Sequence, residues 1–231
     1  PAGIVKFDSV KPGDELNGYA RVSYGRFNAV NAQGAIGGQL AGDAVSARLS
    51  LLYQRQDDYV DNVLPSGTTK NAFEGFEEFA GRLQVLLKPS DDLDILLGGQ
   101  LRSLDGTARL FRANVFTKGQ KGLNSNYVRG QVSTDGQNEQ SVDTWNLSGR
   151  ITWDAGPVSI ISVTSYWDGD ATSVGDVDGG FGANFLPPNL TGPGNIPFTA
   201  ETRDSVPSLK QFTQELRFES NGDGPLSYQG G

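Results

Sequence analysis

The chain has 231 residues and contains neither cysteine nor histidine, which excludes disulfides, thiolate metal sites and histidine-based catalysis within it. Its net charge of −8 and pI of about 4.6 argue against a surface that binds nucleic-acid phosphates. It has no apolar run of the roughly eighteen residues that a membrane helix needs. A membrane β-strand needs only about 9–11 residues with every second one apolar, so this composition still allows a membrane β-barrel.

Alternation of apolar and polar residues recurs along the chain and predicts strands with one apolar face. The predicted strands are 44–55, 79–87, 93–103, 145–153, 157–167 and 211–219. In 157–167 two adjacent apolar residues, Ile160 and Ile161, interrupt the alternation and suggest a β-bulge. Apolar residues do not recur at helical spacing, so the fold class predicted is all-β.

The connections between these strands alternate between short and long. The short ones are Ala41–Asp43, Pro89–Asp92, Asp154–Gly156 and Asn221–Gly224, and the long ones are 58–75, 105–142 and 170–209. In an up-and-down antiparallel sheet, alternate connections lie at the same edge. The pattern therefore predicts a transmembrane β-barrel architecture, with short turns on one rim and long loops on the other.

Aromatic residues near the predicted strand ends support this interpretation, because barrels carry aromatic belts at both lipid–water interfaces. These residues are Tyr53, Phe79, Trp145, Trp153, Tyr166, Trp167, Phe212 and Phe218. The high strand propensity of aromatic residues is an alternative reason for their position. A soluble β-sandwich is the alternative fold, but its strands usually have about 5–6 residues, and sorting of loop lengths by rim is not expected in it.

The first thirty-eight residues, PAGIVKFDSVKPGDELNGYARVSYGRFNAVNAQGAIGG, resemble the junction between plug and barrel in TonB-dependent outer-membrane receptors. Gly3 to Pro12 matches the last plug strand, Gly18 to Asn28 the first barrel strand and Gly34 to Leu40 the next one. Residues 47–62, 79–97 and 212–220 resemble later barrel strands with their turns. The resemblance implies that 1–14 is the C-terminal end of a plug domain with its connector. Residues 15–231 would then be the N-terminal part of an incomplete barrel.

Barrels of this family close with about 22 strands, whereas this sequence predicts about eight strands and the start of a ninth. We therefore expect a fragment that forms an open, curled antiparallel sheet of 8–9 strands. The two edges of such a sheet would expose unpaired backbone groups and promote aggregation.

Candidate functional residues lie in the predicted connector and loops. By resemblance, Lys11, Pro12, Gly13 and Asp14 connect plug and barrel, although Pro and Gly would also form an ordinary turn. In the loop 105–142, Arg109, Phe111 and Arg112 are candidates for binding an anionic chelate, because arginine suits carboxylates; a solvated loop is the alternative.

Asp168, Asp170, Asp176 and Asp178 alternate with glycines after the strand 157–167. Carboxylates in such a loop can bind calcium, but their spacing does not match an EF-hand. We keep Asp176 and Asp178 as candidate substrate contacts, and we predict no metal site, no cofactor and no catalytic residue.

The resemblance implies a receptor in the bacterial outer membrane that actively takes up a scarce nutrient. A ferric siderophore is the expected small-molecule ligand, with cobalamin and oligosaccharides as alternatives. Its other partners would be outer-membrane lipid and the TonB energy-coupling complex, and nucleic acid is not expected. Two alternatives remain open at this point: a passive porin or structural outer-membrane barrel, and a soluble extracellular β-sheet adhesin. Nothing in the sequence indicates an enzyme.

Overall fold

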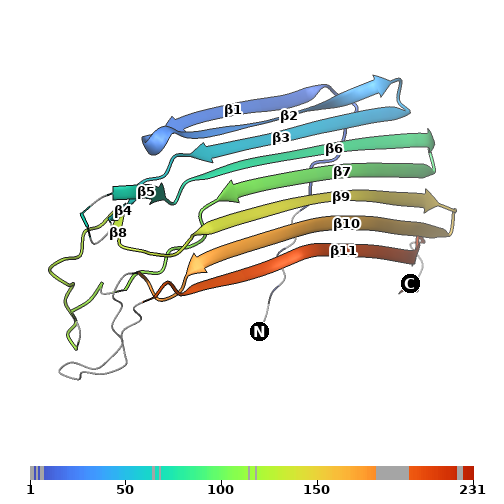
Figure 1. The fold of residues 1–231 in the computed structure, drawn as a ribbon. Helices are drawn as coiled ribbons and strands as arrows, with labels where there is room; N and C mark the ends of the chain where they lie inside the picture. Colours follow the sequence, from blue (N-terminus) through green and yellow to red (C-terminus); the bar gives the residue numbers. More distant parts are fainter. Residues whose placement is uncertain are drawn as a thin grey trace.

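The computed structural model describes residues 3, 5, 8–63, 66–67, 69–113, 115–117, 119–180, 198–222 and 226–231. Nine antiparallel strands form one open sheet in the order β1-β2-β3-β6-β7-β9-β10-β11-β12 (Figure 1). Their bounds are β1 Asn17–Gly25, β2 Ala29–Ala41, β3 Val45–Gln56, β6 Phe76–Ser90, β7 Leu93–Gly106, β9 Glu139–Asp154, β10 Val158–Asp176, β11 Glu201–Ser220 and β12 Gln229–Gly230. The predicted all-β fold and the open sheet are thereby confirmed.

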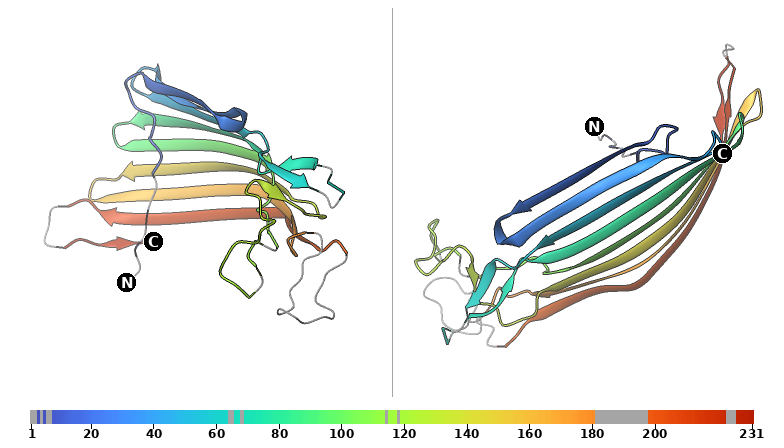
Figure 2. Two further views of the ribbon diagram at one scale, coloured as in Figure 1. Left: turned by 90° about the vertical axis from the view of Figure 1, so that its left-hand side faces the viewer. Right: turned by 90° about the horizontal axis from the view of Figure 1, so that it is seen from above.

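The sheet is curved along its strands, with a concave and a convex face (Figure 2). A second, three-stranded sheet of β4 Val60–Val63, β5 Thr69–Phe73 and β8 Gln131–Val132 lies at one end, where it is formed by two of the long connections (Figure 1). The 3₁₀ turn η1, Arg26–Asn28, joins β1 to β2. Within the described residues, no helix is long and apolar enough to cross a membrane.

After the first hairpin, whose short turn η1 lies at the long-loop end, short turns and long loops lie at opposite ends of the strands, as the sequence predicts (Figure 1). Gly42 joins β2 to β3 with a φ of 47°, and Gly156 joins β9 to β10 with a φ of 87°. Residues other than glycine rarely adopt this left-handed backbone conformation, so glycine allows both turns to be tight. Part of the predicted turn Asn221–Gly224, residues 223 and 224, lies outside the described residues.

The register places the apolar residues of neighbouring strands opposite one another. Tyr53 pairs with Phe79, and Leu101 pairs with Trp145. Side chains that are directly opposite in an antiparallel pair share a face. A slip of one residue would turn every side chain of a strand to the other face, so this register keeps one apolar face and one polar face where the strands alternate.

The predicted bulge at Ile160 and Ile161 is wrong, because both residues pair in continuous register with β9 and β11. The irregularity between β10 and β11 instead lies between Gly169 and Ala171. It includes Pro207 of β11, which has no backbone N–H to donate and is therefore tolerated where pairing is interrupted.

β10 and β11 are also longer than predicted, with 19 and 20 residues. The connection between them spans 177–200 rather than 170–209. Asp168 and Asp170 consequently lie within β10 and not in a loop. Polar residues such as Asp204 and Arg203 fill the outer part of β11, which removes the apolar alternation from which a strand is predicted.

Candidate functional site

The concave face carries the polar residues of the alternating strands, and neighbouring strands link them. Arg102 Nε on β7 donates to Glu78 Oε1 on β6 at 2.6 Å. Arg82 Nη2 on β6 donates to Gln100 Oε1 on β7 at 3.0 Å. These bonds hold long side chains in a fixed arrangement, so the concave face is an ordered polar surface rather than a set of independent charges.

Residues 8–16 cross this concave face before the chain enters β1 (Figures 1 and 2). Arg82 donates a hydrogen bond to the Ser9 hydroxyl, and Lys88 Nζ lies 3.8 Å from Asp14 Oδ1. At the start of β1, Arg48 Nη1 donates to Asn17 Oδ1 at 2.8 Å. Polar groups from β3 and β6 thus anchor this segment at three points.

The predicted connector residues lie in this crossing segment. Pro12 is buried, whereas Lys11 and Asp14 are exposed and Gly13 is half-buried. The buried proline fits its position because it needs no hydrogen-bond partner for a backbone N–H. The placement agrees with a chain that passes through the concave interior, and the connector role itself stays a prediction.

The convex face is apolar, and its large side chains are open to the surroundings: Phe212 is 66% exposed, Leu216 60% and Leu147 58%. Soluble proteins rarely expose a continuous apolar surface of this size. On β9, Trp145 and Trp153 bound the apolar stretch at either end. The Trp145 ring lies against Tyr166 of β10, with centroids 5.3 Å apart, as in an aromatic belt.

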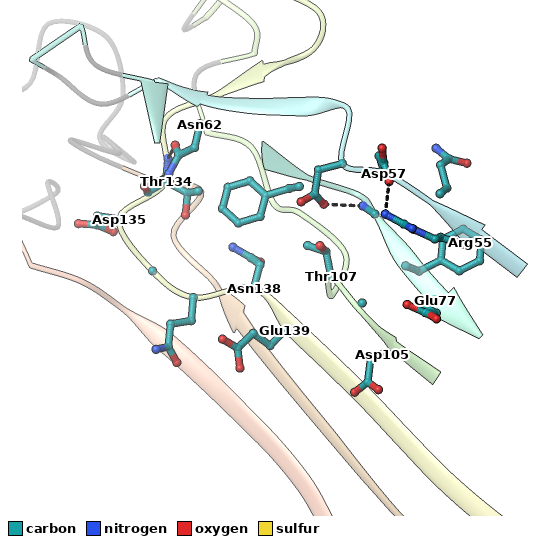
Figure 3. Close-up of a pocket in the computed structure, with 18 residues that line it drawn as sticks. Arg55, Asp57, Asn62, Glu77, Asp105, Thr107, Thr134, Asp135, Asn138 and Glu139 are labelled. Atoms are coloured by element: carbon teal, nitrogen blue, oxygen red, sulfur yellow. Dashed lines mark hydrogen bonds and ion pairs between the residues drawn. The ribbon is translucent and has the colours of Figure 1, made fainter. Parts of the chain in front are cut away.

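A cleft of about 1170 Å³ opens at the long-loop end of the sheet (Figure 3). Its lining comes from the ends of β3, β6 and β7 and from the segment before β9. The ionisable residues in the lining are Arg55, Asp57, Asp58, Glu77, Asp105, Asp135 and Glu139. The cleft is therefore acidic and suits a cationic group better than an anionic one.

Hydrogen bonds order both walls of this cleft. Asn28 Nδ2 donates to Asp57 Oδ2 at 2.7 Å and Arg55 Nη2 lies 2.9 Å from Asp57 Oδ1; the bond from Asn28 and the charge of Arg55 lower the pKa of Asp57. On the other wall, Asn62 and Thr134 are buried and pair twice, through Asn62 Nδ2 to Thr134 O and Thr134 N to Asn62 Oδ1, each at 2.9 Å. The paired bonds attach β4 to the segment before β9.

The three residues predicted to contact a chelate, Arg109, Phe111 and Arg112, lie outside this cleft. Arg109 and Phe111 are exposed on the loop that follows β7. Arg112 lines a smaller cavity of about 400 Å³ together with Tyr127. The structure therefore places them on the long-loop rim, as predicted, but does not bring them into one pocket.

Asp176 and Asp178 are buried, with exposed fractions of 1% and 5%. They lie beside Asp135, and one carboxylate oxygen from each of the three lies within 4.8 Å of the others. Asp168 and Asp170 do not belong to this group. Sequence reasoning missed Asp135 because it lies some forty residues before Asp176, and only the pairing of β9 with β10 brings the two together.

The comparisons with known proteins rest on the fold. No protein-family model matches the sequence, and no curated protein matches it. The ferric yersiniabactin uptake receptor FyuA from Yersinia pestis is similar in structure, with a TM-score of 0.59 and 14% identity over 94% of this chain and 29% of that one. The ferric-catecholate import receptor Fiu from E. coli K12, in a closed form, gives a TM-score of 0.65 and 15% identity over 92% and 30%.

The chain thus spans less than a third of the length of either receptor, 29% and 30%. At these identities the similarity establishes the fold. It confirms that the chain has the fold of part of a TonB-dependent receptor, as the junction residues suggested.

Proposed function

We propose that this chain forms part of the barrel wall of a bacterial outer-membrane receptor that actively imports a scarce nutrient. The observation that carries the proposal is the two-faced sheet: an apolar convex face bounded by Trp145 and Trp153, and a polar concave face crossed by residues 8–16. Lipid on the convex side accounts for so extended an exposed apolar surface. The similarity to two import receptors supports transport rather than catalysis.

Residues 8–16 favour an active receptor over a passive porin. A porin needs an open lumen, whereas this segment is held against the concave face by Arg82, Lys88 and Arg48. A chain anchored inside the barrel suits an energy-coupled plug that rearranges during transport. The TonB complex would then be the energy-coupling partner, acting through a plug that continues from residues 1–14.

A ferric siderophore is the ligand we propose, by analogy with the two similar receptors. Many such chelates are anionic, so the acidic cleft of Figure 3 is a poor site for them. Arg109 and Arg112 with Phe111 lie on the adjacent loop and offer cationic and aromatic contacts. We therefore place ligand capture on this loop.

Deletion of the full-length gene, followed by growth under iron starvation with defined siderophores as the iron source, tests the proposal. We expect the deletion strain to lose growth on one siderophore and the wild-type gene to restore it. The wild-type gene should not restore growth when the energy-coupling system is inactivated. Uptake that continues without energy coupling would instead identify a porin. Recovery of the protein in the soluble fraction would identify an adhesin.

The double variant Arg109→Ala, Arg112→Ala tests separately whether the loop that follows β7 captures the ligand. We expect weaker binding of the siderophore by about tenfold or more, since charge-assisted hydrogen bonds contribute roughly 1.5–3 kcal/mol each. Arg21→Ala, on β1 far along the sheet, is the matched control. Equal binding by both variants would remove Arg109 and Arg112 from the ligand site.

A further inference from the structure

Three aspartates from two separate segments meet at the long-loop end of the sheet. Asp135 lies between β8 and β9, Asp176 is the last residue of β10, and Asp178 follows two residues later. One carboxylate oxygen from each lies within 4.8 Å of the others. Among the residues that the structure describes, no lysine or arginine forms an ion pair with this group, which we call the Asp135 cluster.

Two oxygens of the Asp135 cluster have no partner although they are inaccessible to solvent. They are Asp178 Oδ2 and Asp135 Oδ1, and Asp178 as a whole is only 5% exposed. A surface aspartate would have water at these atoms. A buried carboxylate oxygen without any donor costs free energy that a charged or hydrogen-bonding partner would recover. The unpartnered oxygen of Asp178 thus points independently to a bound positive group.

Hydrogen bonds hold other carboxylate oxygens of Asp176 and Asp178 in place. Asp176 accepts hydrogen bonds from the Thr134 hydroxyl and from Gly179 N, the latter at 3.1 Å. Asp178 Oδ1 accepts from Gly180 N at 2.9 Å. These donors fix the carboxylates from one side without neutralising them, so the negative charges stay close together.

Glu201, at the start of β11, brings a further negative charge to this end of the sheet, where its Oε1 accepts from Gln137 N at 2.6 Å. Among the described residues, no cationic side chain pairs with Glu201 or with the three aspartates. The negative charges of this region are therefore not balanced by the described part of the chain.

We propose that the Asp135 cluster binds one calcium ion through Asp135, Asp176 and Asp178. Oxygen-only ligands select a hard cation. Ca²⁺ accepts irregular sets of carboxylate and carbonyl oxygens, whereas Mg²⁺ demands a near-octahedral arrangement and gives up its waters reluctantly. The three carboxylate oxygens, all within 4.8 Å of one another, lie close enough together to contact one such ion.

Such an ion would fasten the segment before β9 to the outer ends of β10 and β11. Gln137 N of that segment already donates to Glu201 Oε1 at 2.6 Å, so the two parts are in contact. The same segment carries Thr134, Asp135 and Asn138 into the wall of the acidic cleft (Figure 3). Calcium would therefore stabilise one wall of that cleft, whatever ligand the protein transports.

Calorimetric titration of the full-length protein, purified in detergent and stripped with EDTA, tests the site with CaCl₂ and MgCl₂. We expect Asp178→Asn and Asp135→Asn each to bind one Ca²⁺ fewer per chain than the wild type, with Ca²⁺ bound at least tenfold more tightly than Mg²⁺. Asp170→Asn is the matched control, because Asp170 is exposed on the same strand and outside the cluster. It should retain the wild-type stoichiometry.

Two results would overturn the site: an unchanged calcium stoichiometry in Asp178→Asn, or no calcium binding by the wild type at 1 mM. In the second case a proton shared between Asp176 and Asp178 would take the place of the metal. Retention of the β-sheet circular dichroism spectrum by each variant separates loss of the site from loss of the fold. The titration does not depend on the transported ligand, so it stands apart from the tests of the proposed function.

Discussion

The hydroxyl of Thr164 on β10 donates a hydrogen bond of 2.5 Å to the side-chain oxygen of Gln214 on β11, on the convex face. Gln214 Nε2 in turn donates to Ser162 Oγ at 3.0 Å. Polar groups that face lipid must find partners within the protein. The convex face thus tolerates polar side chains where neighbouring strands pair them, and a charge without a partner should be costly there.

Leu147→Arg places such a charge on the convex face between Trp145 and Trp153. We expect it to destabilise the protein folded in lipid vesicles by up to about 2–4 kcal/mol, the cost of arginine near the membrane midplane. Ser148→Arg, one residue along on the concave face, should cost less than about 1 kcal/mol. Urea titrations in vesicles measure both. Equal costs would mean that lipid does not cover the convex face.

The anchoring of residues 8–16 predicts a difference between two polar contacts. Arg48 is only 8% exposed and holds Asn17, whereas the side chains of Lys88 and Asp14, 3.8 Å apart, are 39% and 60% exposed. Exposed ion pairs contribute only about 0–1 kcal/mol, but hydrogen bonds of a charged group contribute roughly 1.5–3 kcal/mol. Arg48→Ala should therefore free the segment more than Asp14→Ala.

A nitroxide on Val10→Cys reports this difference, because Val10 is 66% exposed and the chain has no other cysteine. We expect the mobile fraction of the spectrum to increase in Arg48→Ala and to change little in Asp14→Ala. A spectrum unchanged by Arg48→Ala would show that other contacts hold the segment.

The double hydrogen bond between Asn62 and Thr134 should be needed for the loop fold around the cleft. Asn62→Ala leaves the buried backbone N–H and C=O of Thr134 without partners. Each unpartnered group should lower the stability of the loop fold by up to about 1–3 kcal/mol. Faster proteolysis within 107–138 at an unchanged rate elsewhere is the expected result. Asn126→Ala, on an exposed part of the same loop, should leave the rate as it is.

The Asp135 cluster predicts a pH dependence in calcium-free buffer. The pKa values of Asp135 and Asp178 are raised from an ordinary 3.8. The folded protein then binds more protons than the unfolded one between 3.8 and the raised pKa values, so the free energy of unfolding falls as pH rises through this window.

Hydrogen exchange of residues 133–138 between pH 4 and pH 7, corrected for intrinsic rates, measures this change. Protection should be greater at the lower pH, and Asp178→Asn should make the dependence shallower, because one titrating group is lost. Added calcium should restore protection at pH 7 in the wild type. Protection that increases steadily with pH would contradict the predicted sign.

Much of the nine-stranded sheet could be predicted from sequence because its strands have one apolar face, and alternation such as that from Trp145 to Trp153 indicates a strand of this kind. Beyond the aromatic residues at the strand ends this alternation stops. The outer half of β11 is polar on both faces, so its strand pairing with β10 left no pattern to detect. For the same reason Asp168 and Asp170 were assigned to a loop.

The candidate sites were harder to predict, because their residues come together through pairing of distant strands. Asp135 and Asp176 are in separate predicted loops and meet only because β9 runs antiparallel to β10. Arg55 and Glu139 line one cleft although two strands of the nine-stranded sheet, β6 and β7, intervene in sequence. Residue type indicated the chemistry at these positions, but only the order and pairing of the strands show that these residues lie close together.

The length of β10 and β11 affects how a ligand could bind at the outer end of the protein. A strand of 20 residues extends about 65 Å at roughly 3.3 Å per residue, whereas a tilted membrane crossing uses only about 9–11 residues. In the proposed receptor, nearly half of each strand would therefore stand outside the hydrocarbon layer as hydrogen-bonded sheet. A ligand that meets this rigid extension loses less entropy on binding than one that must first order a flexible loop.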